Sequence, residues 1–210
     1  LRRLGTDYID LYQIHWPDVT TPIEDTMGTI AQLITQGKVR YAGVCNYDAD
    51  QLQEAQKYID LLSNQVPYSL VTRKIEKEVV PYCVNNNLSI IAYSPLERGL
   101  LTGKIKPGHQ FVEGDHRPGL NSYKPENITR TNAFLEKIRP LANEKKVTLS
   151  QLVIRWTIEQ PAVTTALVGA RNAKQAIENA GALELKLSRE EIDFITEQSN
   201  ELNLVTTNDG

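Results

Sequence analysis

The sequence predicts an α/β fold in which parallel strands alternate with helices. Five short runs of β-branched and apolar residues are each followed by a longer amphipathic segment. Strands that alternate with helices pair in parallel, because each helix supplies the crossover connection. The 210 residues are enough for one domain with a sizeable core. A doubly wound open sheet and a (β/α)8 barrel both fit, and the pattern alone favours neither.

Four of the predicted strands lie in the first half of the chain. Gly37 ends the first helix, and Asp48 is a candidate N-cap for the second. The run LSIIAY is the most strand-like of the sequence. We expect strands at Tyr8–His15, Val39–Val44, Leu61–Val66 and Leu88–Tyr93, with helices at Pro22–Gln36, Asp48–Tyr58 and Lys74–Asn86.

A long segment rich in glycine and proline, Ser94–Glu126, separates the two halves. It is too long for a plain connection, and loops of that length in a compact domain are usually functional. Beyond it, Thr148 is a candidate cap, and the run from Ser188 to Glu191 is a capping box that opens a final helix to about Asn200. We expect helices at Ile128–Lys145, Ser150–Glu159 and Ala173–Ala182, and a strand at Val163–Val168.

Composition excludes several classes of function. The net charge is −3, so nothing predicts binding to nucleic acid or to an anionic membrane. No apolar run is long enough to span a membrane. Cys45 and Cys83 stand alone, without the spacing of metal ligands, which favours a reducing compartment such as the cytoplasm and no bound metal. The absence of a GxGxxG motif argues against a Rossmann dehydrogenase.

Short motifs at the predicted strand ends decide between the two architectures. Together with the opening segment Leu1–Leu11 and the later run Ile177–Asn179, they resemble the aldo-keto reductases, in the same order along the whole chain. The resemblance implies a (β/α)8 TIM barrel, of which residues 1–210 form the C-terminal part of a single domain with strands four to eight. The strand-end motifs are Ile14–Asp18, Gly43–Asn46, Asn64–Tyr68, Ala92–Leu96 and Leu167–Arg171.

The resemblance assigns one catalytic residue to this chain. The histidine that matches His15 donates a hydrogen bond to the substrate carbonyl oxygen, where negative charge builds up during hydride addition. A lone histidine there is otherwise more often a core residue bonded to backbone. Asp18 is expected to be a turn or cap residue. The catalytic Asp, Tyr and Lys of the family belong to its earlier strands, so we expect the 210-residue chain to be inactive by itself.

Four further residues match the family's nicotinamide site. Cys45, Asn46 and Gln65 stand where the family grips the carboxamide, and Tyr93 stands where an aromatic ring stacks on the nicotinamide. Without the resemblance, Cys45 could equally be a small buried hydrophobe, Asn46 a turn residue and Tyr93 a packing residue. Gln65 on an apolar strand is harder to explain as packing, because a buried amide needs partners.

The remaining matches concern the phosphates and the adenosine. The segment from Ser94 to Lys104, including Leu96 and Arg98, resembles the loop over the pyrophosphate. Gly169 and Arg171 precede a helix N-terminus, which favours an anion, and Arg171 is the candidate partner of a 2′-phosphate. The side chains expected to face adenine and ribose share one helix face; they are Gln175, Glu178 and Asn179.

The sequence therefore predicts an NADPH-dependent reductase of aldehydes and ketones, with NADH the less favoured cofactor. Some relatives carry a Lys-Ser pair where this chain has Gly169 and Ala170, so the cofactor class is better predicted than the preference. One alternative is a non-catalytic NADPH-binding protein on the same barrel, such as the potassium-channel β-subunits of the family. A second alternative is another TIM-barrel class that binds phosphorylated substrates at the Gly169 helix terminus. The carbonyl substrate and the oligomeric state stay open.

Overall fold

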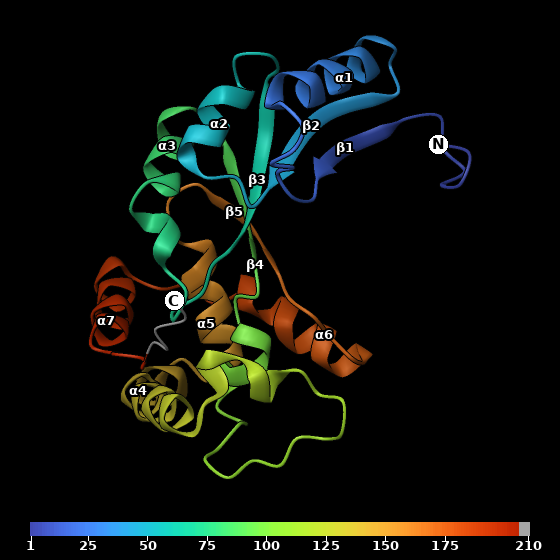
Figure 1. Ribbon diagram of the computed structural model, residues 1–210. Helices are drawn as coiled ribbons and strands as arrows, with labels where there is room; N and C mark the ends of the chain where they lie inside the picture. The colour runs from blue at the N-terminus through green and yellow to red at the C-terminus, as the bar shows by residue number, and fades with distance from the viewer. Residues whose placement is uncertain (206–210) are drawn as a thin grey trace. The chain divides into compact units, whose positions relative to one another are not determined.

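A computed structural model describes residues 1–205 of the chain. It contains one sheet of five strands in the order of the sequence (Figure 1). The first four strands pair in parallel, so the predicted α/β class with parallel strands is confirmed. The strands are β1 (Ile9–Ile14), β2 (Val39–Cys45), β3 (Leu61–Pro67), β4 (Ser89–Tyr93) and β5 (Val163–Leu167).

The contacts between Cα atoms divide the chain into two compact units. Unit 1 comprises Leu1–Pro67, Lys74–Tyr93 and Pro161–Thr165. Unit 2 comprises Tyr68–Arg73, Ser94–Gln160 and the described residues from Ala166 onward. The expectation that all of these residues belong to a single barrel domain stays a prediction.

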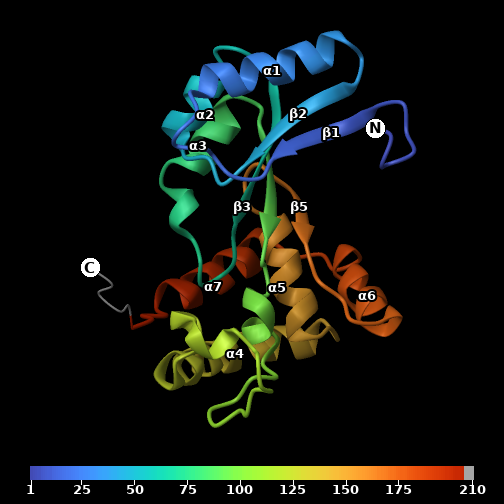
Figure 2. The ribbon, with the colours of Figure 1, turned by 45° about the vertical axis from the view of Figure 1, so that its right-hand side comes forward.

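In unit 1 the helices follow the strands one by one. Helices α1 (Ile23–Thr35), α2 (Ala49–Ala55) and α3 (Val79–Asn85) lie along one face of the sheet (Figures 1 and 2). The core between them is apolar and fully buried, which is what stabilises a parallel sheet covered by helices. Its members include Met27, Val44, Leu52, Cys83 and Ile90.

Unit 2 is largely helical and contains the long loop. Helix α5 (Leu149–Ile158) buries most of its residues, and the ring of Trp156 in its last turn lies 5.7 Å from that of Tyr68. Helix α6, in contrast, has no buried residue. The other helices of the unit are α4 (Pro125–Glu144), α6 (Ala173–Ala180) and α7 (Arg189–Asn200), and three 3-10 turns shape the loop: η2 (Glu97–Thr102), η3 (Arg117–Gly119) and η4 (Asn121–Tyr123).

The predicted helix caps are confirmed. Asp48, Thr148 and Ser188 each accept a hydrogen bond from the backbone N–H three residues on. In all three cases the residue at that third position returns the bond to the cap backbone, which completes a capping box. A cap of this kind is worth about 1 kcal/mol, because it satisfies backbone donors that the helix leaves free.

Four predicted helices have a boundary that is wrong by two or more residues, and one of them, α2, ends at Ala55 and not at Tyr58. The expected helix Lys74–Asn86 is a 3-10 turn, η1 (Lys74–Glu76), followed by α3, because Pro81 fits only in the first turn of a helix. Helix α4 begins at Pro125 and not at Ile128, so the loop ends before Glu126; proline is favoured at that first position. Helix α6 ends at Ala180 and continues as the 3-10 turn η5 (Gly181–Leu183).

Candidate active site

The predicted site residues fall into two groups, one in each unit. The group in unit 1 gathers at the carboxyl ends of β1 to β4, and the group in unit 2 surrounds a pocket. In parallel sheets the carboxyl ends of the strands meet at one edge, which is where α/β proteins usually bind their ligands. The unit 1 group consists of His15, Cys45, Asn46, Gln65 and Tyr93, and the unit 2 group of Ser94, Leu96, Arg98, Gly169, Arg171, Gln175, Glu178 and Asn179.

Asn46 joins three strand ends of unit 1. Its side-chain amide donates to the backbone oxygen of His15 at 3.1 Å and accepts from the Tyr93 hydroxyl at 3.0 Å. Its backbone N–H donates to the carbonyl of Gln65 at 2.8 Å. The residue has φ 63°, a left-handed conformation that asparagine tolerates better than most residues. One N–H and one lone pair of the amide remain for a ligand.

Cys45 and Gln65 lie side by side in the register of β2 and β3. Gln65 is half-buried, but Cys45 is only 3% exposed. Burial raises the pKa of the Cys45 thiol, so this side chain behaves as a small core residue in the described conformation. Its role toward a cofactor stays a prediction, with less geometric support than that of Gln65.

His15 is exposed just beyond β1, beside an exposed indole. The ring of Trp16 lies 6.0 Å from the imidazole and is 58% exposed. Asp18, two residues on, accepts hydrogen bonds from the side chains of Thr20 and Thr21 and from the Thr20 backbone. The bond from the Thr20 hydroxyl is the main reason that the pKa of Asp18 lies below its ordinary value. Asp18 is a turn residue, as predicted.

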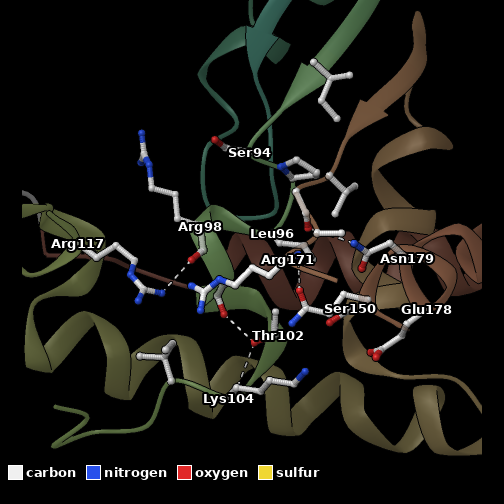
Figure 3. A pocket seen from close by; sticks show the side chains of 18 of the residues that line it. Ser94, Leu96, Arg98, Thr102, Lys104, Arg117, Ser150, Arg171, Glu178 and Asn179 are labelled. Atoms are coloured by element: carbon white, nitrogen blue, oxygen red, sulfur yellow. Dashed lines mark hydrogen bonds between the residues drawn. The ribbon is translucent and has the colours of Figure 1, made fainter. Parts of the chain in front are cut away.

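The pocket of unit 2 has a volume of about 660 Å³, within the range of small-molecule sites (Figure 3). All eight predicted residues of this unit line it. They come from two segments far apart in the sequence, the residues that follow β4 and the residues from the end of β5 into α6. The prediction that these two segments share one site therefore has geometric support. That the ligand of this site is a nicotinamide cofactor stays a prediction.

The segment that follows β4 has an unusual backbone. Ser94, Glu97 and Arg98 have φ values of 56°, 46° and 50°, and Gly99 has 102°. Positive φ is uncommon outside glycine and costs of order 1–3 kcal/mol per residue, and such strain clusters at functional sites. The single hydroxyl proton of the buried Tyr123 is shared between two carbonyl groups of this turn, those of Glu97 and Arg98, each 2.9 Å from the hydroxyl oxygen.

The start of α6 forms the opposite wall of the pocket. Asn172 caps the helix by accepting from the Gln175 backbone, and the Gln175 side chain accepts from the Arg171 backbone at 2.8 Å. Asn179 donates to the carbonyl of Gly169 at 3.2 Å. These bonds hold the backbone of the turn, and within residues 1–205 no acidic side chain forms an ion pair with Arg171. Figure 3 shows the Arg171 side chain extending into the pocket.

Four other polar residues of the pocket were not predicted as cofactor ligands: Thr102, His109, Arg117 and Ser150. Arg117 is held by Asp115, two residues earlier, whose carboxylate accepts from Nε and Nη2 at 2.6–3.1 Å. These bonds hold the pKa of Asp115 far below its ordinary value. The guanidinium also lies 5.1 Å from the centre of the Phe111 ring.

The sequence contains little signal for the position of Arg117. Phe111 and Leu120 pack on a buried cluster that includes Leu100, Tyr123 and Ile128, and this long-range packing folds the loop back onto the pocket. Among residues 1–205 no group of three metal-ligating side chains lies close together, and no helix there is long and apolar enough to cross a membrane.

The charged residues that line the pocket are mostly cationic. Arg98, Lys104 and Arg171 face it, as does the Asp115-bound Arg117, and Glu178 is the acidic residue of the lining. Arginine and lysine side chains at the end of a strand and near a helix N-terminus suit a phosphorylated ligand, which they can bind with charge-assisted hydrogen bonds.

Comparisons with known proteins find similar sequences along nearly the whole chain. A profile described as "Aldo/keto reductase family" matches residues 1–200. The NADH-specific methylglyoxal reductase of Escherichia coli (strain K12) is 36% identical over 205 residues, which cover 96% of this chain and 62% of that protein. An aldo-keto reductase of Schizosaccharomyces pombe whose name includes NADP(+) is 36% identical over 200 residues, covering 94% of this chain and 59% of that protein.

A solved structure has the same fold over the whole chain. The glycerol dehydrogenase from Gluconobacter oxydans superposes with a TM-score of 0.91 at 31% identity, covering 100% of this chain and 64% of that one. The chain thus spans about three fifths of the length of these relatives, from 59% to 64%.

Proposed function

The chain belongs to the aldo/keto reductase family, and from that premise we propose that it is part of an NADPH-dependent oxidoreductase that reduces aldehydes or ketones. Proteins of this family use nicotinamide cofactors and act on carbonyl groups. Five parallel strands with their helices correspond, in this proposal, to strands four to eight of a (β/α)8 barrel. The pocket of unit 2, with its cationic lining, is the observation that carries the proposal.

We assign the phosphates and the adenosine of the cofactor to that pocket. Arg171 has no acidic partner in the described chain, and its backbone N–H is already bonded to Gln175, so its guanidinium is the group available to a 2′-phosphate. This favours NADPH over NADH. The name of one relative includes NADH and that of the other NADP(+), so the relatives do not decide between the cofactors. The proposed preference for NADPH therefore depends on Arg171 in this chain. Arg98 and Ser94 would meet the pyrophosphate.

We assign the chemistry and the nicotinamide to the strand ends of unit 1. When bound, the reduced nicotinamide would supply the hydride. The exposed imidazole of His15 would donate a hydrogen bond to the carbonyl oxygen that gains negative charge. The free N–H and lone pair of Asn46, with the amide of Gln65, suit the carboxamide, and Tyr93 would offer its ring face. Cys45 would act by packing beneath them.

A nucleotide titration tests the cofactor proposal. The 210-residue chain is titrated with NADPH and with NADH, and the nicotinamide fluorescence is followed. We expect NADPH to bind at least tenfold more tightly, and Arg171→Ala to remove about a factor of ten for NADPH but not for NADH, the size of one charge-assisted contact. Lys174→Ala, which removes an exposed lysine of α6 outside the pocket, is the matched control. Equal affinities would refute the NADPH preference, and no binding of either would refute the cofactor.

A turnover assay tests the enzymatic part. His15 is the only catalytic residue that the family resemblance assigns to residues 1–210, so we propose that this chain alone reduces carbonyls poorly. Methylglyoxal and NADPH serve as probes, with NADPH oxidation as the signal. Rapid turnover that His15→Ala abolishes would contradict the low activity and support the reductase. Tight NADPH binding without turnover in any longer form of the protein would favour the non-catalytic alternative.

The location and the partners are part of the same proposal. Cys45 and Cys83 are free and buried, as in proteins of reducing compartments, and we propose the cytoplasm. The expected partner is a small carbonyl compound, with neither nucleic acid nor membrane.

A further inference from the structure

A buried carboxylate of unit 2, that of Glu97, has no role in the site described above. Glu97 stands in the strained turn after β4 and precedes Arg98, yet it does not line the pocket. Its side chain is only 11% exposed. Charged side chains are rarely buried unless they are paired, so the surroundings of this carboxylate should reveal its function.

Three neutral hydroxyl groups surround the Glu97 carboxylate. Ser69 and Thr72 donate to Oε2 at 3.3 and 3.2 Å, and Ser122 lies 3.5 Å from Oε1. These donors come from the turn after β3 and from the 3-10 turn before α4, so the carboxylate links three separate segments of unit 2. The hydroxyl groups compensate for lost hydration, but they carry no charge.

Arg98 forms an ion pair with Glu97. The distance from Arg98 Nη1 to Glu97 Oε1 is 3.9 Å, and the arginine side chain is 44% exposed. In Figure 3 the Arg98 side chain points away from Arg171, whose guanidinium reaches into the pocket. The carboxylate thus pairs with an arginine of the pocket wall whose side chain points away from Arg171.

We propose that Glu97 is an internal counter-ion of Arg98, with which the phosphate groups of the ligand must compete. The inference depends on the proposed function, because it takes the pocket ligand to be a phosphorylated nucleotide. Binding would require Arg98 to leave Glu97 and turn toward the pyrophosphate. The carboxylate would also repel the incoming anion. Both effects weaken binding, and both would ease release of the spent cofactor.

Glu97→Gln separates the charge from the hydrogen bonds. The amide oxygen of glutamine can accept from Ser69 and Thr72, and the amide nitrogen can donate to Ser122, so the three links to neighbouring segments are preserved. The negative charge is lost, and with it both the attraction for Arg98 and the repulsion of an incoming anion. We expect Glu97→Gln to bind NADPH and inorganic pyrophosphate about three- to tenfold more tightly, the scale of a partly exposed charge pair.

Two comparisons show whether the gain passes through Arg98. Glu113→Gln removes the same charge from an exposed residue of the long loop outside the pocket, and should change either affinity less than about twofold. In an Arg98→Ala background, Glu97→Gln should give a clearly smaller gain than in the native background. Unchanged or weaker binding by Glu97→Gln, or an equal gain without Arg98, would overturn the proposal. If the native chain binds neither probe, the proposed function itself fails.

A spectroscopic measurement covers the case in which Glu97→Gln does not fold. The Arg98 Nε–H resonance of the native chain is assigned by its absence in Arg98→Ala. Addition of pyrophosphate should shift it as the guanidinium leaves Glu97. A resonance that stays in place while pyrophosphate binds would refute the displacement.

Discussion

The strand ends of unit 1 and the pocket wall of unit 2 present polar side chains from backbones of different kinds. In unit 1 the parallel register places Cys45 beside Gln65 and Pro67 beside Tyr93, and Asn46 is the one predicted residue there with positive φ. In unit 2 the wall after β4 contains three non-glycine residues with positive φ, held by the Tyr123 hydroxyl and the Glu97 carboxylate. Sheet pairing positions the first group, and buried side chains position the second.

The largest expected effect concerns the sheet. A Cβ atom on Gly43 would lie 2.6 Å from Ser63 Oγ and 3.2 Å from Gln13 Cγ, all within the paired strands. We expect Gly43→Ala to lower the free energy of unfolding by about 2 kcal/mol, because a tightly packed sheet cannot accommodate the added carbon. Gly28→Ala in α1, where nothing lies within 4 Å, is the control and should be stabilising by up to about 1 kcal/mol. Urea unfolding of both variants measures the difference, and equal effects would contradict the role of the sheet.

The next effect concerns the strained wall of unit 2. Tyr123→Phe removes the donor to the carbonyls of Glu97 and Arg98, and should lower the free energy of unfolding by about 1–2 kcal/mol and weaken pyrophosphate binding. Tyr58→Phe removes an exposed hydroxyl in the turn that follows α2, and should change neither by more than about 0.5 kcal/mol. If pyrophosphate affinity is unaffected by Tyr123→Phe, then the Tyr123 hydroxyl does not position the wall.

A third test addresses the ion pair within the long loop. The pKa of Asp115 is lowered in the folded chain. Its pairing with Arg117 therefore stabilises the fold at pH values above the ordinary carboxyl pKa, and this stabilisation is lost only as the pH falls toward the lowered pKa. Between pH 5 and pH 8 we expect the ion pair to stay intact, so it should cause no change with pH in the rate of proteolytic cleavage within residues 104–124 of the native chain. Asp115→Asn should accelerate cleavage severalfold throughout that range, measured by mass spectrometry with a protease active over it. Cleavage as slow as in the native chain would show that the apolar cluster alone orders the loop.

The smallest effect lies outside both sites. Lys146, which follows α4, has φ 56° and takes no part in either group. Glycine adopts this conformation without a steric penalty, so Lys146→Gly should raise the free energy of unfolding by about 0.5–1 kcal/mol without changing ligand affinity. The thermal midpoint and a pyrophosphate titration check both parts. A loss of affinity would mean that strain outside the pocket wall also serves binding.

Local sequence signals predicted most of the regular fold. The caps at Asp48, Thr148 and Ser188 depend on residues three positions apart, and they are as expected. Boundaries near proline were less predictable. Helix α3 begins only at Val79, which places Pro81 in its first turn, and helix α4 begins at Pro125, earlier than predicted. In each case the outcome depends on which turn of the helix the ring occupies.

The candidate site likewise contains residues that the sequence could predict and residues that it could not. The residues at the strand ends could be predicted, because the sheet register carries their side chains to one edge. The contribution of Arg117 could not, because it depends on Phe111 and Tyr123 packing within a loop that has no period. The counter-ion Glu97 was missed for a related reason, since its hydroxyl partners Ser69 and Thr72 are more than twenty residues away in the sequence.

Both cysteines of the chain, Cys45 and Cys83, lie in the core of unit 1, and burial raises the pKa of Cys83 to about 12. Alkylating reagents attack thiolates, so neither sulfur will react until unit 1 opens. The rate of thiol labelling under native conditions therefore reports the opening of that unit alone. Unit 2 has no cysteine, and a single one introduced at Val112, which is 78% exposed, would carry a fluorophore on the long loop without background labelling. The opening of unit 1 and the motion of the long loop in unit 2 can therefore be measured separately.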